Sequence, residues 1–160
     1  MQRTIVRNQA RRRKKATNKL VLVSCSAAKR EIPATPIPAI DRYNGVLFKV
    51  IRKNLPVDSF RPRIRIAIVS AKYGFVTESM AVPLYDQKLN ASRAEVIRAN
   101  VRKGLRGLLR RRQFDRIFVS LGRSYAALVE DLPELQRATW ATGSIGKRAA
   151  ALKAWMNRKQ

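Results

Sequence analysis

Three short runs of apolar, β-branched residues constrain the fold of this chain more than any other feature of its sequence. They lie at 20–26 (LVLVSCS), 64–70 (IRIAIVS) and 116–121 (RIFVSL). Continuous apolar runs of this length are typical of strands buried on both faces of a parallel sheet. Helical patterns lie between and after them, at 45–54, 92–112, 123–132 and 145–157. This alternation predicts an α/β fold: a single three-layer, Rossmann-like domain with a mostly parallel sheet of about four strands flanked by helices.

The helix expected at 92–112 has the clearest pattern. Ser92 and Glu95 form an S-x-x-E capping box, and Gly104 and Gly107 predict a bend or close packing. One face is apolar, with Ile97, Val101, Leu105 and Leu108, and the other is basic, with Arg98, Arg102, Arg106 and Arg110. An ordinary solvated face would mix both signs of charge, yet no acid follows Glu95 until Asp115. We therefore expect the basic face to contact nucleic acid, with a solvated face as the alternative.

Residues 1–19 form a basic arm ahead of the domain at 20–160. The arm has eight Lys and Arg residues and no acid, and its densest run is Arg11, Arg12, Arg13, Lys14 and Lys15. Such blocks are usually disordered without a partner and bind nucleic acid or a signal receptor, and a solvated tail without a fixed role is the alternative. The net charge of +25 leaves 25 − 8 = +17 outside the arm. An anionic partner would relieve the resulting repulsion.

Composition excludes several chemistries. The chain has no His, which rules out Ser-His and Cys-His dyads, and its one Cys cannot form a disulfide or a Cys-based zinc site within the chain. We expect no metal and no cofactor. No apolar run approaches the roughly 18 to 20 residues that span a bilayer. We expect a cytoplasmic, nucleoid- or ribonucleoprotein-associated protein that binds DNA or RNA and no membrane, and the sequence leaves its oligomeric state open.

Ligands of an open parallel sheet bind beyond the carboxyl ends of its strands, so the loops that follow the three apolar runs are the expected pocket. These loops combine hydroxyls, tyrosine rings, glycines and a cation. The candidate pocket residues are Ser24, Cys25, Ser26, Lys29, Tyr43, Ser70, Tyr73, Gly74, Tyr85, Gly122 and Tyr125.

Catalytic candidates in these loops are few. Asp86 is the candidate general acid or base and Lys72 its electrostatic partner, although Lys72 and Asp86 could also be a structural ion pair with Tyr73 and Tyr85 as core residues. Asp41 is favoured as a helix N-terminal residue. Cys25 is either a nucleophile with a lowered pKa or, with no His to act as base, a small buried apolar residue.

The segment Gly143-Ser144-Ile145-Gly146-Lys147-Arg148 opens the last expected helix. Small residues and backbone N–H groups at a helix start, followed by Lys147 and Arg148, suit a phosphate of a nucleic-acid backbone or of a nucleotide. Simple capping of the helix is the alternative. The segment lacks the G-x-x-x-x-G-K-[ST] pattern of a Walker A loop, so nucleotide hydrolysis is not supported.

Taken in order, several motifs resemble those of an α/β family of unknown function that is distantly related to peroxide-stress protein YaaA. The resemblance covers about residues 20–156, and its motifs are LVSCSxxK, YNGxxF, IVSAKYGF, PxYD, LGxxY and GxIGKR. The pair Ser70-Ala71-Lys72-Tyr73-Gly74 and Pro83-x-Tyr85-Asp86 is the most specific part. The resemblance implies an α/β fold, a link to DNA binding and protection from oxidative damage, and an association with nucleic-acid base modification and with phages. It implies no settled reaction.

Two functions follow from these patterns. The first is a nucleic-acid-binding protein that contacts the phosphate backbone through the arm and the basic helix face, with little sequence specificity. The second is an enzyme that acts on a nucleotide or on a base in nucleic acid, with its site in the strand-end crevice around Lys72, Tyr85 and Asp86. Attachment of the arm to an anionic membrane is less well supported, because the arm lacks a bulky apolar face.

Overall fold

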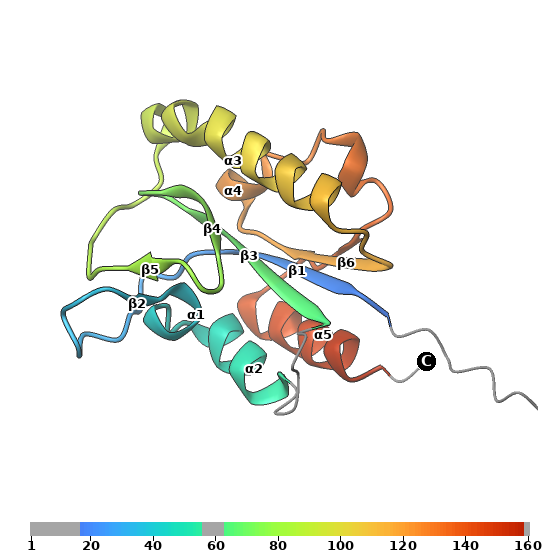
Figure 1. The fold of residues 1–160 in the computed structure, drawn as a ribbon, viewed down its shortest axis with the longest axis horizontal. Coiled ribbons are helices and arrows are strands. Elements are labelled where there is room, and N and C mark those ends of the chain that lie inside the picture. The colour runs from blue at the N-terminus through green and yellow to red at the C-terminus, as the bar shows by residue number, and fades with distance from the viewer. Residues whose placement is uncertain (1–16, 56–62, 159–160) are drawn as a thin grey trace, which may run out of the picture.

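The main sheet has five strands in the order β4-β3-β1-β6-β7, and all of them are parallel except the edge strand β4. They are β1 (Lys19–Ser24), β3 (Ile64–Ser70), β4 (Gly74–Thr77), β6 (Arg116–Ser120) and β7 (Thr139–Trp140). The computed structural model describes residues 17–55 and 63–158, so the predicted cations from Arg11 to Lys15 lie outside the described residues. The predicted α/β class and mostly parallel sheet are confirmed (Figure 1).

Helices cover both faces of the sheet and make the expected three layers (Figure 1). One face carries α1 (Ala39–Arg42), α2 (Val46–Asn54) and α5 (Ile145–Asn157), and the other carries α3 (Ala91–Arg111) and α4 (Arg123–Ala126). Two short strands, β2 (Ile37–Pro38) and β5 (Ala81–Val82), pair outside the main sheet, and a 3-10 turn, η1, spans Pro133–Leu135. Within the ranges described, no helix is long and apolar enough to cross a bilayer.

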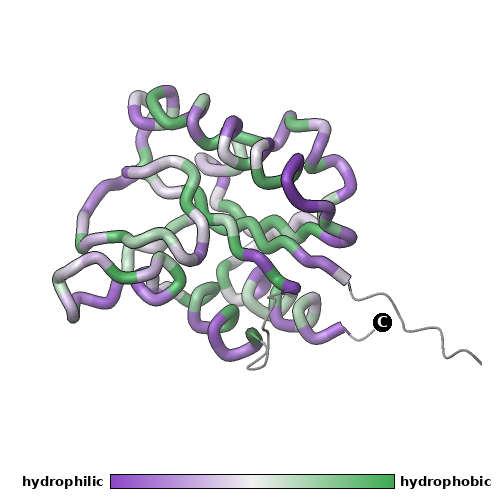
Figure 2. Tube along the Cα trace, in the orientation of Figure 1, coloured by the Kyte–Doolittle hydropathy of each residue, from purple (hydrophilic) through white to green (hydrophobic). Residues whose placement is uncertain are grey.

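The central strand β1 is buried on both sides, as its apolar run predicts. Val21 and Val23 face the α2 and α5 layer, whereas Leu20 and Leu22 face α3, and none of the four has exposed surface. Hydrophobic residues accordingly concentrate along the strands and the inner sides of the helices (Figure 2). The two cores on either side of the sheet hold the strand ends in a fixed relation to one another.

Helix α3 differs from its prediction at the N-terminus. The expected capping box at Ser92 and Glu95 is wrong: the helix begins at Ala91, and the side chain of Asn90 accepts a hydrogen bond of 2.8 Å from the amide of Arg93. Glu95 instead pairs with Arg98 on the helix surface. Asparagine is as good an N-cap as serine, so the helix is capped as well by Asn90 as it would have been by Ser92, two residues later.

The helix expected at 123–132 is much shorter than predicted, because α4 ends at Ala126. Beyond it, hydrogen bonds of the i to i−3 type tighten the chain, for example from Leu128 to Tyr125. The carbonyl of Ala127 accepts instead from Arg98 of α3 at 3.0 Å. The tighter turns bury Leu128, Val129 and Leu132 under α3, which a regular helix would not do with consecutive residues.

Candidate functional site

The parallel strands end together at one edge of the main sheet, here called the carboxyl edge. Val23 of β1 lies in register with Ile68 of β3 and with Ser120 of β6. Because alternate residues face the same side of a sheet, the side chains of Cys25, Ser70 and Ser120 all point toward the α2 and α5 layer. The expectation that strand-end loops gather polar residues here is confirmed for Cys25 and Ser70, and Ser120 is an addition that sequence analysis missed.

A chain of hydroxyl groups lies at this edge. Ser70 Oγ is 2.9 Å from the hydroxyl of Tyr85, which is 2.7 Å from the hydroxyl of Tyr43. Ser70 Oγ also accepts hydrogen bonds from the amides of Lys72 and Tyr73 at 3.2 and 3.1 Å. Because these amides occupy its acceptor positions, Ser70 donates its own proton to Tyr85. In the hydrogen bond between Tyr85 and Tyr43 either hydroxyl can be the donor.

Burial keeps the tyrosines of this edge in the neutral form. It raises the pKa of Tyr43 to about 12 and raises the pKa of Tyr85 above its usual range. The pKa of Tyr125 is also raised, first by burial and then by its hydrogen bond with Cys25. Neutral phenols donate and accept hydrogen bonds but do not act as phenolate bases near neutral pH. The cluster is therefore suited to hydrogen-bonding a ligand.

Two lysines flank the cluster. Lys29 Nζ lies 4.4 Å from the centroid of the Tyr85 ring, and Lys72 Nζ lies 5.4 Å from the same centroid and 5.5 Å from that of Tyr73. All three distances between an ammonium group and a ring centroid are within the range of cation–π attraction. Neither lysine has an ion-pair partner in the part of the chain that the structure describes. The edge therefore carries two ammonium groups without ion-pair partners among the described residues, next to neutral aromatic groups.

Asp86 lies at the mouth of this region. An open pocket of about 400 Å³ is lined by Ala27, Lys29, Glu31, Leu84, Tyr85 and Asp86. Asp86 is exposed and forms no ion pair with Lys72 among the described residues, so the structural pairing considered for them is not formed. The alternative that Tyr73 and Tyr85 are core residues holds for Tyr85, which is buried in the core, and in part for Tyr73, which packs against that core. The pocket places Asp86 beside Lys29 and Tyr85.

Cys25 follows β1 directly and is half-buried. Its Sγ lies 3.3 Å from the hydroxyl of Tyr125, which α4 carries after its N-cap residue Gly122. Ser26 acts in the loop structure: its Oγ accepts from the amide of Gly45 at 3.1 Å and donates to the carbonyl of Ala28. Ser24 is half-buried on the other face of the sheet. No carboxylate or other base contacts the thiol in the described ranges, so the arrangement supports hydrogen bonding by Cys25 better than nucleophilic attack.

Arginine side chains that bind backbone carbonyls hold the loops of the site. Arg93 at the start of α3 donates to the carbonyls of Ala71 and Lys72, and this contact fixes the turn that carries Lys72. In that turn Gly74 has φ +71°, the left-handed region that favours glycine, so the chain can reverse into β4. Arg93 could not be predicted as a site residue, because nothing in its local sequence distinguishes it from the many other arginines.

The basic face of α3 has acidic partners from another part of the chain. Arg102 forms two 2.9 Å hydrogen bonds with Asp131, and Arg106 forms one of 2.9 Å with Glu134. The hydrogen bonds from Arg102 lower the pKa of Asp131 below its usual range. The expectation that this face lacks acids is thereby corrected, because the carboxylates come from the connection between β6 and β7. Arg110 at the end of the helix stays exposed, without an ion pair in the residues described.

The start of α5 is capped as its alternative interpretation predicted. Ser144 Oγ accepts a hydrogen bond of 3.4 Å from the amide of Lys147. Lys147 is exposed, whereas Arg148 lies on the inner side of the helix with Ala149 and Leu152. Phosphate binding by this segment stays a prediction. Asp41 lies in the first turn of α1, which confirms its favoured structural role.

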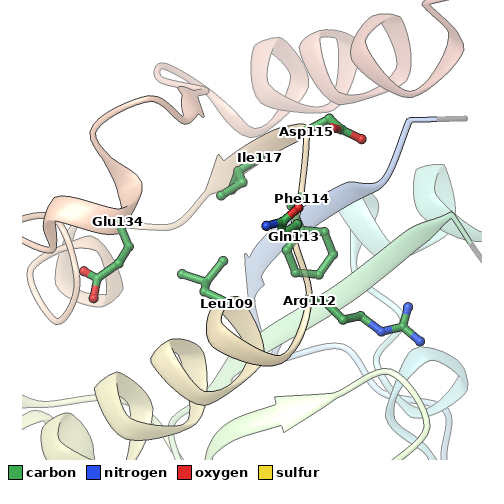
Figure 3. A pocket seen from close by; sticks show the side chains of 7 residues that line it. All are labelled: Leu109, Arg112, Gln113, Phe114, Asp115, Ile117 and Glu134. Atoms are coloured by element: carbon green, nitrogen blue, oxygen red, sulfur yellow. The ribbon is translucent and has the colours of Figure 1, made fainter. Parts of the chain in front are cut away.

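A second pocket, of about 420 Å³, lies at the opposite, amino edge of the sheet (Figure 3). It is lined by Leu109, Arg112, Gln113, Phe114, Asp115, Ile117 and Glu134. Asp115 there accepts a hydrogen bond of 2.7 Å from the amide of Asn18. This pocket lies where α3 turns into β6 and contains none of the candidate pocket residues. No group of three His, Cys, Asp or Glu side chains in the described segments is placed to hold a metal ion.

The doubly covered parallel sheet and the polar cluster at its carboxyl edge define a Rossmann-like α/β protein with a strand-end site. Residues 20–158 match the model of DUF6884, a family of unknown function, and the chain belongs to this family. Neither the curated proteins nor the solved structures contain a match to the chain. The resemblance to the YaaA group stays a prediction.

Proposed function

We propose that this protein binds nucleic acid through the phosphate backbone, with the N-terminal arm and the last turn of α3 as its contact surface. The observation that supports this most directly is the state of Arg110, Arg111 and Arg112. All three are exposed, and none lies within ion-pair distance of a carboxylate of the described residues. Free guanidinium groups at one place are the usual contacts to phosphate.

The start of the described chain lies beside these three arginines. The amide of Asn18 donates to Asp115, and its side chain donates to the carbonyl of Gln113 at 3.4 Å. Lys15 is only three residues from Asn18 along the chain. The five cations from Arg11 to Lys15 therefore belong to a segment that joins the domain next to the end of α3. Arg98, Arg102 and Arg106 contribute less, since carboxylates already neutralise them.

Fluorescence anisotropy with the full chain tests this proposal. Labelled duplex DNA and a structured RNA are titrated across a series of salt concentrations. Replacing Arg110, Arg111 and Arg112 with glutamine is expected to weaken binding by about tenfold and to make the log-log salt slope on DNA about 2 to 3 smaller, because each phosphate contact contributes about 0.9. Replacing the five arm cations from Arg11 to Lys15 with glutamine should have at least as large an effect.

The matched control replaces three exposed lysines elsewhere, Lys49, Lys88 and Lys153, with glutamine, which removes the same charge. We expect this control to bind within about threefold of the wild-type protein, because long-range attraction between exposed charges is screened by salt. An equal loss in the control and the α3 variant would contradict the proposed surface. A salt-independent affinity would contradict backbone binding altogether.

A second candidate function is favoured by the pocket at the carboxyl edge: an enzyme that acts on a nucleotide or on a base in nucleic acid. The pocket brings Asp86 beside Lys29 and Tyr85, and the Tyr85 hydroxyl belongs to the network that begins at Ser70. In this proposal Asp86 is the general acid or base and Lys72 stabilises negative charge. Two lysines within 6 Å of one ring suit an anionic substrate.

If the protein turns over a nucleotide or a modified base, Asp86→Asn is expected to lower the rate by about 100-fold, the usual size of a general acid–base contribution. Because Asp86 is exposed, the variant should unfold at the same denaturant concentration as the wild-type protein. Glu31→Gln, at the same pocket, is the control and should retain most of the activity. Full activity of Asp86→Asn would remove Asp86 from the mechanism.

A further inference from the structure

Helices α2 and α5 begin side by side at the carboxyl edge. Their C-terminal ends are joined by a 2.9 Å hydrogen bond between Asn54 and Asn157, and both helices run opposite to the parallel strands. Gly45, the N-cap of α2, is hydrogen-bonded to Ser26 just beyond β1, and it offers no side chain to cap the first turn. Helix N-termini present free N–H groups and a positive partial charge. Both N-termini therefore lie at the carboxyl edge, on the same face of the sheet.

A buried hydroxyl without a partner lies at the same edge of the sheet. Ser120, the last residue of β6, is 0% exposed, and its Oγ has no hydrogen-bond partner in the segments that the structure describes. Its side chain faces the α2 and α5 layer, where the neighbouring strand ends carry Cys25 and Ser70. An unsatisfied buried hydroxyl lowers stability, whereas alanine would avoid this penalty. The serine is explained if a ligand supplies its missing partner.

A guanidinium group in the same layer is also incompletely paired. Nε and Nη1 of Arg148 are shielded from solvent and have no hydrogen-bond partner within residues 17–55 and 63–158. This differs from Arg42, Arg52 and Arg93, whose guanidinium groups all bind backbone carbonyls. Burying the donors of a cation without an acceptor is strongly unfavourable. Two shielded N–H groups of Arg148 therefore lack an acceptor, and an anionic ligand could supply one.

The geometry of α5 places Arg148 toward the carboxyl edge, about 4 Å beyond the level of Ser120. The rings of Phe118 and Trp155 pack with their centroids 5.4 Å apart, which ties β6 to α5 at one point. Ser120 lies two residues beyond Phe118, about 6.6 Å toward the carboxyl edge. Arg148 lies two turns before Trp155, about 10.5 Å in the same direction, on the inner face that Leu152 shares. Both residues therefore lie toward the carboxyl edge from Trp155, in the layer where α2 and α5 begin.

We propose that Arg148, Ser120 and the first turns of α2 and α5 together form a subsite for a phosphate monoester. A guanidinium presents its N–H groups in a fork that matches two phosphate oxygens, and the Ser120 hydroxyl and the helix amides can reach the remaining ones. A carboxylate has too few oxygens to satisfy all of these donors. The hydroxyl cluster of Tyr43 and Tyr85 lies at the same edge, where it can contact the group that carries the phosphate.

This subsite does not depend on the proposed nucleic-acid function. The polymer surface proposed above is at the amino edge, around Arg110–Arg112, whereas Arg148 and Ser120 are at the carboxyl edge. A terminal phosphate can enter between the two helix starts, while the internal diester of a polymer is flanked by sugars on both sides. The expected ligand is therefore a small molecule with a terminal phosphate.

Isothermal titration calorimetry of the full chain with inorganic phosphate, a nucleoside 5′-monophosphate and the matching nucleoside tests the subsite. We expect both phosphates to bind and the nucleoside to bind at least tenfold more weakly than its monophosphate. Arg148→Met should weaken phosphate binding at least tenfold, because it removes charge-assisted hydrogen bonds. Lys153→Met, which removes a charge from the exposed side of the same helix, should bind phosphate as the wild-type protein does.

Ser120→Ala provides a separate test that does not change charge. It should weaken phosphate binding several-fold while leaving the unfolding temperature unchanged or higher, because it removes an unsatisfied buried hydroxyl. A purely structural role for Ser120 would instead lower that temperature and leave phosphate binding unchanged. Acetate that binds as tightly as phosphate would overturn the choice of ligand.

The subsite itself is overturned if neither phosphate binds to the wild-type protein, or if Arg148→Met and Lys153→Met bind phosphate equally well. If Arg148→Met does not fold, wild-type phosphate affinity in Ser120→Ala overturns it. Oligonucleotide binding by Ser120→Ala should be unchanged, so a failure of the nucleic-acid proposal leaves the subsite standing, and the reverse also holds.

Discussion

Replacing Arg42 with methionine is expected to lower the free energy of unfolding by about 3 to 5 kcal/mol, because several backbone carbonyls lose a hydrogen bond from a charged donor and each buried polar group left unsatisfied costs about 1 to 3 kcal/mol. Arg42 is 0% exposed, and no carboxylate pairs with it in the described ranges. Its guanidinium binds four backbone carbonyls instead, those of Arg30, Pro33, Thr35 and Val82.

The size of this effect follows from what the variant leaves behind. Methionine fills a similar volume but donates no hydrogen bond, so four carbonyl oxygens lose their donor at once. Three of them, in residues 30–35, belong to the loop between β1 and β2, and Val82 belongs to β5. Arg42 is therefore the side chain that joins this loop to the rest of the carboxyl edge. We expect the loop that carries Glu31 and lines the pocket to lose its order with the guanidinium.

Urea unfolding followed by circular dichroism measures this loss on the full chain. Arg30→Ala is the matched control, because it removes an exposed arginine side chain from the same loop but keeps the carbonyl that Arg42 binds. The control should change stability by less than about 0.5 kcal/mol. Arg42→Lys should still lose most of the stabilisation, since one ammonium group cannot reach carbonyls that a guanidinium fork separates. Equal stability of Arg42→Met and Arg30→Ala would contradict this account.

Two glycines of α3 are expected to respond to alanine with opposite signs. A Cβ added at Gly104 would lie 2.6 Å from the Cβ of Phe75 and closer still to its ring, so the helix and β4 would have to separate. Contacts this short put the cost at the upper end of overpacking, about 2 to 3 kcal/mol, whereas the gain in helix propensity is about 1 kcal/mol. Gly104→Ala should therefore lower the free energy of unfolding by about 1 to 2 kcal/mol.

Gly107 lies three residues further along the same helix and serves as the control. A Cβ there would meet only the guanidinium of Arg111, at 3.4 Å from Nη1, and the end of that side chain can move. Gly107→Ala should raise the free energy of unfolding by about 1 kcal/mol through helix propensity alone. Chemical denaturation of the two variants should therefore differ by about 2 to 3 kcal/mol.

The cause of the difference can be isolated with Phe75→Leu, which removes the ring that a Cβ at Gly104 would meet. Added to Gly104→Ala, this substitution should cost less than it does in the wild-type protein, because the clash is relieved. Strict additivity of the two substitutions would show that the ring is not what constrains Gly104. The expectation of a bend or close packing at this glycine is resolved in favour of close packing, since α3 packs on β4 through Gly104.

Part of the candidate site followed from the strand pattern. Ser70 and Cys25 were expected at one edge, because they end apolar runs and parallel strands end together. Tyr43 and Tyr85 were expected in the same pocket, and their hydroxyls are in contact at 2.7 Å. Ser120 also ends an apolar run, but it is the last residue of β6 itself, so the pattern assigns it to the strand and not to the loop that follows.

The role of each arginine could not be predicted from the sequence. Arg42 binds residues 7 to 40 positions away, and Arg102 pairs with Asp131, 29 positions away. Which carbonyl or carboxylate lies within reach of a long side chain depends on the packing of whole elements against one another. The face of α3 therefore looked unpaired along the sequence, although the structure supplies its acids from the segment after β6.

The helices and strands of this protein and its fold class follow from local patterns in the chain. Short apolar runs rich in β-branched residues are typical of strands buried between two layers, and the 3.6-residue period of 92–112 indicates a helix, so burial and local geometry predict the α/β fold. Which cations are neutralised and which stay free depends on the tertiary packing. Ion pairs and buried hydrogen bonds depend on distances of a few ångströms between segments far apart in the chain, and local patterns carry no information about those distances. For the same reason, only the packing of α5 beside β6 brings Arg148 and Ser120 into the same layer.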